Sequence, residues 1–415
     1  MKFIADFHIH SKYSRATSKD MDLESLDKWA KIKGIGLLGT GDFTHPEWFN
    51  NLREKLEPAE PGLFKLKNTQ SRTRFMLTSE ISCIYTQSNR VRKIHIIVFA
   101  PSLEVVDQIN ARLGWTGNLK SDGRPILGMS TKELAKIIFA TSEDCLLIPA
   151  HAWTPWFSVF GSRSGFDSIE ECFGEYSKHI YAIETGLSSD PAMNWRLSAL
   201  DNITLISNSD SHSPRKIGRE ANVFDVELNY SAIIQTIKEK DSRKFLYTIE
   251  FFPEEGKYHY DGHRSCGVRL SPSESKKCNN VCPVCGRPLT IGVMNRVEEL
   301  ADRPYDFRPE NAIPFKSLVP LNEIVAESLG VGSASQRVEV EYKKLIDNLG
   351  SEFHVLLEAS REELVSATLP EIAEGILRVR EGKVSLDPGY DGVYGKVKIF
   401  SQGEQKQPLK QKNLL

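Results

Sequence analysis

Apolar residues recur along the first 250 residues in short runs of strand length, separated by segments with helical spacing. A first run begins at Phe3, and the later ones are Ile35–Thr40, Phe75–Thr78, Ile94–Phe99, Cys145–Pro149, Tyr181–Ile183 and Thr204–Ser207. Between them, Asp22–Lys33 and Thr131–Ala140 show the apolar spacing of helices. Because strands that alternate with helices are typical of an α/β layer or barrel, we predict an α/β domain over residues 1–250.

The pattern changes twice in the remainder of the chain. The composition turns polar and cysteine-rich after residue 250, and the last hundred residues look helical. The predicted helices are Leu321–Leu329, Ser335–Leu349, Arg361–Ala367 and Leu369–Glu381, with Gly350 as a C-cap. We therefore expect a metal-binding module at residues 251–302, a helical DNA-binding domain at 303–400 and a polar, disordered tail at 401–415.

Composition narrows the class of protein. The 415 residues are 40% hydrophobic and carry a formal net charge of −2, so no global positive field indicates nucleic acid, and any such partner must be held by a local basic patch. Seven cysteines, four of them clustered between Cys266 and Cys285, fit a reduced compartment with a metal site better than a disulfide framework. No apolar run approaches the ~20 residues of a membrane helix, and we expect a cytoplasmic protein.

Histidines and carboxylates gather where the predicted strands end. His8 and His10 share one face at the end of the first strand. His95 would lie at the same edge, where the predicted strands end, if its strand returns antiparallel through the turn Gln87–Arg90. The full set is His8, His10, Asp42, His45, Glu80, His95, His151, Asp210 and His212. Any one histidine could instead be an ordinary core or surface residue, but together these groups suit Zn²⁺ or Mn²⁺, with Glu80 as a bridging ligand.

A second metal site is predicted between residues 263 and 286. His263-x2-Cys266-Gly267 and Cys282-x2-Cys285-Gly286 form two knuckles of a zinc ribbon, in which each glycine permits a tight turn that lets backbone amides face the thiolates. Cys278 is a competing fourth ligand in place of His263. We favour His263 because it reproduces the spacing of the second knuckle.

Two further segments carry candidate binding groups. The segment that follows the strand ending at Ile183 contains side chains that can stack on a base, hydrogen-bond to the edge of the base and bind a phosphate. These residues are Glu184, Ser188, Ser189, Asp190, Asn194, Trp195 and Arg196. The same residues also fit a helix N-terminus capped by Ser189 or Asp190, with Trp195 in the core. The aromatic group Trp153–Phe157, just after His151, could line a substrate pocket together with this segment or could belong to the core.

The order of these motifs resembles that of the polymerase and histidinol phosphatase (PHP) domain, a distorted (β/α)7 barrel. The resemblance implies a cluster of two or three divalent ions (Zn²⁺, Mn²⁺ or Mg²⁺) that hydrolyses phosphoesters, with His8, His10, Glu80 and Asp210 as its catalytic residues. Metal ions suit an anionic phosphodiester because they lower the pKa of bound water and neutralise the developing oxyanion. The chain departs from the PHP pattern at Ser14-Arg15-Ala16, and Asp42 and His45 are spaced more widely than the usual adjacent pair.

Barrel, zinc ribbon and helical tail in this order resemble the endonuclease Q family. That resemblance implies a DNA-repair enzyme that hydrolyses the phosphodiester 5′ to deaminated bases (uracil, hypoxanthine, xanthine) and abasic sites, with damaged DNA as partner and a structural Zn²⁺. An extruded base that pairs weakly costs less to unstack, so we expect a base pocket beside the metal cluster. The alternatives are a small-molecule phosphatase of the histidinol-phosphate type and a non-catalytic DNA-binding adaptor.

Two motifs in the C-terminal part each fit two interpretations. Gly330-Val331-Gly332 is either a plain helix break or a hairpin whose glycine amides grip a DNA backbone. The final Gln411–Leu415 resembles the start of a sliding-clamp-binding box but lacks its two aromatic residues, so it is either a clamp contact or a chance match.

Overall fold

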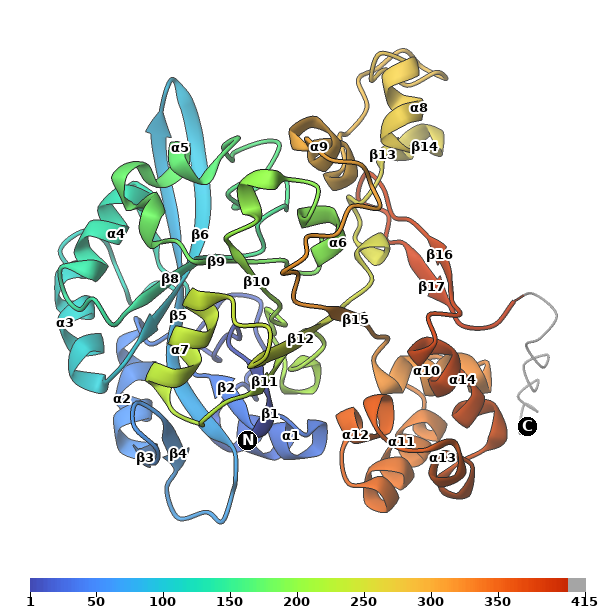
Figure 1. The fold of residues 1–415 in the computed structure, drawn as a ribbon, viewed down its shortest axis with the longest axis horizontal. Helices are drawn as coiled ribbons and strands as arrows, with labels where there is room; N and C mark the ends of the chain where they lie inside the picture. The colour runs from blue at the N-terminus through green and yellow to red at the C-terminus, as the bar shows by residue number, and fades with distance from the viewer. Residues whose placement is uncertain (402–415) are drawn as a thin grey trace, which may run out of the picture.

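A computed structural model describes residues 1–401, and its centre is a mixed sheet of eleven strands (Figure 1). The strands are β1 (Lys2–Asp6), β2 (Leu37–Gly39), β3 (Leu56–Pro58), β4 (Phe64–Leu66), β5 (Arg74–Gln87), β6 (Arg90–Ala100), β7 (Ile126–Leu127), β8 (Leu146–Pro149), β11 (Ala221–Asp225), β12 (Phe245–Glu250) and β15 (Phe315–Ser317). Strands β1, β2 and β5 run parallel, whereas β6 is antiparallel to both β5 and β8. A separate parallel pair, β9 (Ala182–Glu184) and β10 (Thr204–Ile206), packs beside β8. The predicted α/β fold is confirmed.

The long β5–β6 hairpin corrects two predicted strand ends. The strands pair from Leu77 opposite Ala100 to Gln87 opposite Arg90, around a turn whose two central residues have φ of 51° and 59°. Positive φ at both positions matches the twist of a two-residue hairpin. Glu80 therefore lies within β5 instead of after it, and His95 lies within β6 opposite Ser82 instead of at its start. The strand continues past Glu80 because residues 81–86 include β-branched and aromatic side chains that suit a sheet.

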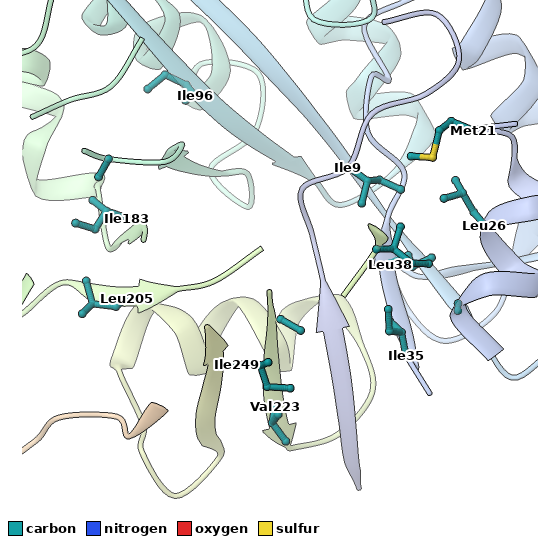
Figure 2. Packing of buried hydrophobic residues seen from close by; sticks show 14 of the residues in the cluster. Ile9, Met21, Leu26, Ile35, Leu38, Ile96, Ile183, Leu205, Val223 and Ile249 are labelled. Carbon is teal, nitrogen blue, oxygen red and sulfur yellow. The ribbon is translucent and has the colours of Figure 1, made fainter. Parts of the chain in front are cut away.

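Helices pack against the sheet, and all of them except the second begin at a side-chain cap. They are α1 (Leu23–Lys33), α2 (Pro46–Lys55), α3 (Leu103–Leu113), α4 (Thr131–Phe139), α5 (Ile169–Phe173), α6 (Pro191–Asn194) and α7 (Tyr230–Glu239). The carboxylate of Asp22 caps α1, and Ser130 with Glu133 forms a capping box at α4, which satisfies otherwise unpaired amides. Figure 2 shows Ile9, Met21, Leu26 and Leu38 gathered in the buried apolar core between α1 and the neighbouring strands.

Residues 253–300 form the predicted cysteine-rich module. It contains β13 (Asp261–His263), β14 (Val268–Leu270), α8 (Pro272–Lys277) and α9 (Val293–Leu300), and it lies at the upper right of Figure 1. Short 3₁₀ turns occur at Gly174–His179, Ser198–Leu200, Pro214–Lys216, Pro253–Glu255 and Arg264–Cys266. The buried Arg296 of α9 donates to the carbonyls of Phe160 and Phe166, which fixes the module to the loops that follow β8.

The C-terminal helices form a separate group at the lower right of Figure 1. They are α10 (Leu321–Leu329), α11 (Gln336–Leu349), α12 (Glu352–Leu357), α13 (Arg361–Ala367) and α14 (Pro370–Arg380), followed by the hairpin β16 (Ser385–Asp387) and β17 (Lys396–Lys398). The nearly buried ion pair between Lys33 of α1 and Glu352 of α12, at 2.7 Å, joins this group to the sheet domain.

The predicted domain boundary at residue 303 is too early. Strand β15 pairs in parallel with β12, so residues 315–317 belong to the main sheet and the helical part begins at Leu321. A three-residue strand that contains Lys316 carries no apolar run by which the sequence could have shown it. Within residues 1–401 every helix is too short or too polar to cross a membrane. The proposed clamp-binding segment lies outside the described residues.

Candidate metal centre

Glu80 joins two groups of metal-ligating side chains. Its Oε2 atom lies 3.5 Å from His8 Nε2 and 3.2 Å from His10 Nε2. Its Oε1 atom lies 2.7 Å from His95 Nδ1 and 3.1 Å from His151 Nε2. The carboxylate is buried, and β5 holds it opposite β6, which carries His95. A carboxylate with one oxygen turned to each group has the geometry that a bridging ligand would need.

Asp210 completes the first of these groups. Its Oδ1 atom lies 3.1 Å from His10 Nε2 and 3.7 Å from His8 Nε2. One ligand atom from each of His8, His10, Glu80 and Asp210 lies within 4.8 Å of all the others, and the same holds for Glu80, His95 and His151. The structure thus brings together six of the nine residues predicted for this cluster.

Two buried carboxylates orient the histidines of the first group from behind. Asp42 Oδ1 lies 3.0 Å from His10 Nδ1, and both oxygens of Glu184 lie 3.0 Å from His8 Nδ1. Each contact favours a proton on Nδ1 and leaves Nε2 directed at Glu80 and Asp210, the arrangement in which an outer carboxylate fixes a metal-binding histidine. Asp42 was predicted as a ligand itself, and the structure places it behind His10 instead.

The remaining two predicted ligands lie at the edge of the cluster. His212 has its ring 4.5 Å from that of His10, and its Nδ1 lies 2.9 Å from the carbonyl of Asp210. His45 is the N-cap residue of α2 and stacks on Tyr13 at 4.5 Å. It belongs to neither group of ligand atoms brought within 4.8 Å among residues 1–401. The wide spacing from Asp42 places His45 at the N-cap position of α2.

Three residues of the centre adopt left-handed backbone conformations. Asp42, His151 and Asp210 have φ of 49°, 29° and 45°. A side chain in this region costs about 1–3 kcal/mol, and such residues persist where the surrounding structure over-determines them, often at functional sites. Asp42, His151 and Asp210 lie two to four residues after the ends of β2, β8 and β10.

At this centre, neighbouring groups counteract the effect of burial on the pKa of Glu80. Burial favours a neutral acid at Glu80, but interactions with the imidazoles of His95 and His8 and with the Arg124 guanidinium hold its pKa well below the usual range. Burial lowers the pKa of His95 to about 4, so its imidazole is neutral near pH 7 and can donate a lone pair to a cation.

Arg124 is a residue of the site that the sequence did not predict. Its Nη1 atom donates to Glu80 Oε2 at 3.0 Å, and 26% of its side chain is exposed. Asp122, which is buried, accepts from the backbone amides of Arg15 and Arg124 and pairs with the Arg15 guanidinium at 3.3 Å. Arg124 stands in an irregular loop before β7, away from any strand end, so no local pattern marks it.

The donor set fits divalent metal ions. It combines imidazoles with carboxylates, the ligands that Zn²⁺ and Mn²⁺ accept. The Nε2 atom of His8 is buried and has no hydrogen-bond partner within the described part of the chain, although such an atom normally has one. An ion bound between His8 and Glu80 would satisfy it.

The predicted zinc-ribbon ligands also come together. One ligand atom each from His263, Cys266, Cys282 and Cys285 lies within 4.8 Å of the others, and Cys278 at the end of α8 is outside this group. Gly267 and Gly286 have φ of 66° and 70°, the left-handed turns that the knuckles require. Burial opposes the Cys282 thiolate, but the amides of Cys285 and Val284 lower its pKa to about 7. These features fit a tetrahedral structural Zn²⁺ site.

The residues predicted to bind substrate are mostly engaged within the protein. Asp190 caps α6, as the alternative interpretation had it, and Ser189 donates to the carbonyl of Thr185. The buried Asn194 accepts from the indole of Trp153, and Arg196 pairs with Glu298 at 2.6 Å.

Glu184, behind His8, is fully buried. These five residues thus have partners within the protein, and their contact with a substrate stays a prediction. Ser188 and Trp195 are half-buried, and Trp195 packs edge-on against Phe315 at 5.6 Å.

The aromatic group after His151 divides between core and surface. Trp153 is 1% exposed and belongs to the core, whereas Trp156 is 42% exposed. The ring of Phe157 packs against that of His95, with centroids 4.6 Å apart and 38° between the ring planes. The core interpretation thus holds for Trp153, and the pocket wall stays a prediction for the exposed Trp156.

Sequence comparisons connect the chain to proteins from an archaeon and a bacterium. A family model described as the MJ0043 C-terminal domain matches residues 320–383. The uncharacterized protein MJ0043 of Methanocaldococcus jannaschii is 35% identical over 263 residues, which are 61% of this chain and 32% of that protein, so the match spans about a third of its length. The uncharacterized protein YqxK of Bacillus subtilis is 30% identical over 420 residues, which cover 96% of this chain and 99% of that protein.

Two solved structures match almost the whole fold. The lesion-specific endonuclease PfuEndoQ from Pyrococcus furiosus superposes with a TM-score of 0.86 and 32% identity, covering 96% of this chain and 95% of that one. Endonuclease Q in complex with a 27-mer duplex substrate that has an abasic lesion at the active site superposes with a TM-score of 0.84 and 32% identity, covering 97% of each chain. The similarity to both endonuclease Q structures extends over nearly the whole of this chain and of theirs, and it includes the sheet domain, the ribbon and the C-terminal helices. The chain therefore belongs to the endonuclease Q family.

Proposed function

We propose that this chain is a metal-dependent endonuclease of DNA repair that hydrolyses the phosphodiester 5′ to deaminated bases and to abasic sites. The observation that carries the proposal is the Glu80 carboxylate, which faces His8 and His10 with one oxygen and His95 and His151 with the other. Family membership supports endonuclease chemistry, since the relative of known structure is a lesion-specific endonuclease. The mixed sheet with the β9–β10 pair would then be the distorted (β/α)7 barrel of the PHP domain.

The residues of the centre divide into ligands and supports. His8, His10, Glu80 and Asp210 would hold one divalent ion, and Glu80, His95 and His151 a second, with His212 at the rim. Ions bound there would lower the pKa of a water nucleophile and neutralise charge that develops on the phosphate. Asp42 and Glu184 keep the imidazoles aimed at the ions. Arg124 stands beside Glu80 with part of its guanidinium exposed, where it can grip a non-bridging phosphate oxygen.

The rest of the fold suits a duplex better than a small molecule. A ribbon held by Zn²⁺ at His263, Cys266, Cys282 and Cys285, and the helices from Leu321 onward, would extend the contact along the DNA. For lesion recognition, an extruded base must enter a pocket beside the cluster. Within the predicted segment, the half-buried Ser188 is the residue we retain as a contact for that base.

A cleavage assay tests the proposal. The purified protein with Mn²⁺ or Mg²⁺ is incubated with labelled duplexes that contain one uracil, hypoxanthine or abasic site, with undamaged duplexes and with histidinol phosphate. We expect a nick 5′ to each lesion only. Phosphate release from histidinol phosphate alone would support the small-molecule alternative, and binding without cleavage would support a DNA-binding adaptor.

A substitution of the bridging ligand makes the assay specific to this centre. Glu80→Gln keeps the size of the side chain but removes the charge that both groups share, so nicking should fall below detection while the melting temperature stays close to that of the wild type. Glu310→Gln, an exposed glutamate, is the matched control. Retained nicking by Glu80→Gln would remove the proposed bridge.

A further inference from the structure

The exposed indole of Trp156 is held in place by residues that contact the metal centre. Thr154 Oγ1 lies 3.3 Å from His151 Nδ1 and donates to the carbonyl of Trp156 at 2.8 Å. On the other side, the ring of Phe157 packs at a tilt against that of His95, and the Phe157 carbonyl accepts from the His95 amide at 3.1 Å. Contacts on both sides of Trp156, a residue that is 42% exposed, thus anchor its loop beside the second group of candidate ligands.

Two more aromatic rings continue this surface toward the ribbon module. Tyr258, in the segment that leads into the ribbon, meets Trp156 edge-on at 6.1 Å and 74°. Tyr394, before β17, is 69% exposed. Lys257 places its ammonium 5.6 Å from the Tyr258 ring and 5.8 Å from the Tyr394 ring. We call Trp156, Lys257, Tyr258 and Tyr394 the aromatic platform.

The backbone fixes the platform as one unit although its members come from three parts of the chain. Gly392 donates its amide to the carbonyl of Lys257 at 2.8 Å, and Gly395 donates to the carbonyl of Glu255 at 3.1 Å. These bonds tie the segment that carries Tyr394 to the segment that carries Tyr258. The rings are therefore presented by rigid neighbours, so little conformational entropy would be lost when a ligand stacks on them.

The chemistry of the platform suits unpaired nucleobases. Every base has a flat π face that stacks on Trp or Tyr without regard to sequence. The ammonium of Lys257 lies between two rings, where it can neutralise the phosphates that join successive bases. A wholly apolar partner would leave that ammonium buried and unpaired, which is costly.

We propose that the aromatic platform binds unpaired bases next to the lesion by stacking, so that the strand is held open beside the metal centre. This inference rests on the proposed function for its biological setting. Its physical claim, binding of single-stranded DNA through bases, concerns residues that take no part in metal binding.

Binding to two single strands, one with bases and one without, tests the platform. The full-length protein is titrated with a fluorescent single-stranded oligonucleotide of mixed sequence, and with a strand of equal length in which every nucleotide is abasic. Both carry the same phosphates, but only the first has bases to stack. We expect Trp156→Ala and Tyr394→Ala each to weaken binding of the first strand about 5- to 150-fold and to leave binding of the second unchanged. Trp156→Phe, which keeps an aromatic face, should retain most of the affinity.

Trp115→Ala is the matched control, because Trp115 is 90% exposed and lies outside the platform. Equal losses for Trp156→Ala and Trp115→Ala, or equal losses for both strands, would overturn the proposal. Melting curves of each variant identify any loss caused by unfolding, and Trp156→Phe then decides the outcome. Binding is measured without added Mn²⁺ or Mg²⁺ so that the abasic strand is not cleaved, and a failure here is therefore distinct from a failure of the lesion-nicking assay.

Discussion

Both carboxylate oxygens of Glu184 lie 3.0 Å from Nδ1 of His8. The same carboxylate accepts from the amide of His151 at 2.7 Å and from the side chain of Asn208 at 2.9 Å. One buried acid thus supports a histidine from each of the two ligand groups that Glu80 joins. Since Glu184 is fully buried, its charge acts on those histidines and not on a bound substrate.

Removal of this carboxylate should weaken metal binding without removing a ligand. Outer partners of metal-binding histidines typically contribute 10–100-fold to affinity or activity, so we expect Glu184→Ala to weaken Mn²⁺ binding by about that factor. The affinity is measured by electron paramagnetic resonance of free Mn²⁺, an ion that the thiolate ribbon does not favour. Glu310→Ala serves as the control. An unchanged Mn²⁺ affinity would show that Glu184 has only a packing role.

Features set by local sequence were the ones that could be predicted. Helices α10 and α13 have the bounds expected from apolar spacing, and Gly267 and Gly286 adopt the turns expected of zinc knuckles. The metal ligands that follow strands also came together. The role of Glu184 could not be predicted in this way, because it depends on a contact with His8 that spans 176 positions.

The role of Arg124 and the position of Glu80 within its strand likewise could not be predicted from local sequence. The sequence cannot show that β5 continues past Glu80, since an apolar run has no internal mark of where pairing stops. Arg124 reaches Glu80 across 44 positions from an irregular loop. In both cases the deciding interaction is non-local, so propensity and spacing carry no information about it.

Arg124 should act on the phosphate and not on the metals. If its guanidinium grips the scissile phosphate, Arg124→Ala should lower kcat/KM for nicking by about 100-fold, a typical effect of losing one charge-stabilising donor. Arg124→Lys should recover only part of this, since a lysine cannot make the paired contacts of a guanidinium. Metal content by mass spectrometry should match the wild type, and Arg112→Ala is the exposed control. A parallel loss of bound metal would place Arg124 in support of the cluster instead.

The fourth ligand of the ribbon can be decided by two cysteine substitutions. His263 Nδ1 lies 3.5 Å from Cys285 Sγ, whereas Cys278 lies outside the ligand group. We expect Cys282→Ser to lose one equivalent of Zn²⁺ and to unfold the module, because such small modules are stabilised mainly by their metal. Cys278→Ser should keep its Zn²⁺ by the same elemental analysis. Loss of Zn²⁺ from Cys278→Ser, together with retention in His263→Ala, would reverse the assignment.

A pair of buried acids behind the site should make stability fall as the pH rises. Burial raises the pKa of Glu250 to about 8 despite hydrogen bonds from Thr248, Thr185 and Ser207, and it raises the pKa of Glu220 as well. The folded protein keeps the Glu250 proton while the unfolded chain releases it above about pH 4.5, so this stabilising term is complete below that pH and is lost as the pH rises through 8.

Glu250→Gln removes the titration while it keeps a hydrogen-bonding side chain. Any constant cost of the amide shifts the melting temperature equally at every pH, so the informative quantity is the slope. We expect the melting temperature of Glu250→Gln, relative to the wild type, to rise steadily between pH 5 and pH 8, as the wild type loses about 1.4 kcal/mol per pH unit from this group. The exposed Glu310→Gln should show no such trend. A parallel course of the Glu250→Gln and wild-type curves would mean that Glu250 is ionised in the folded protein.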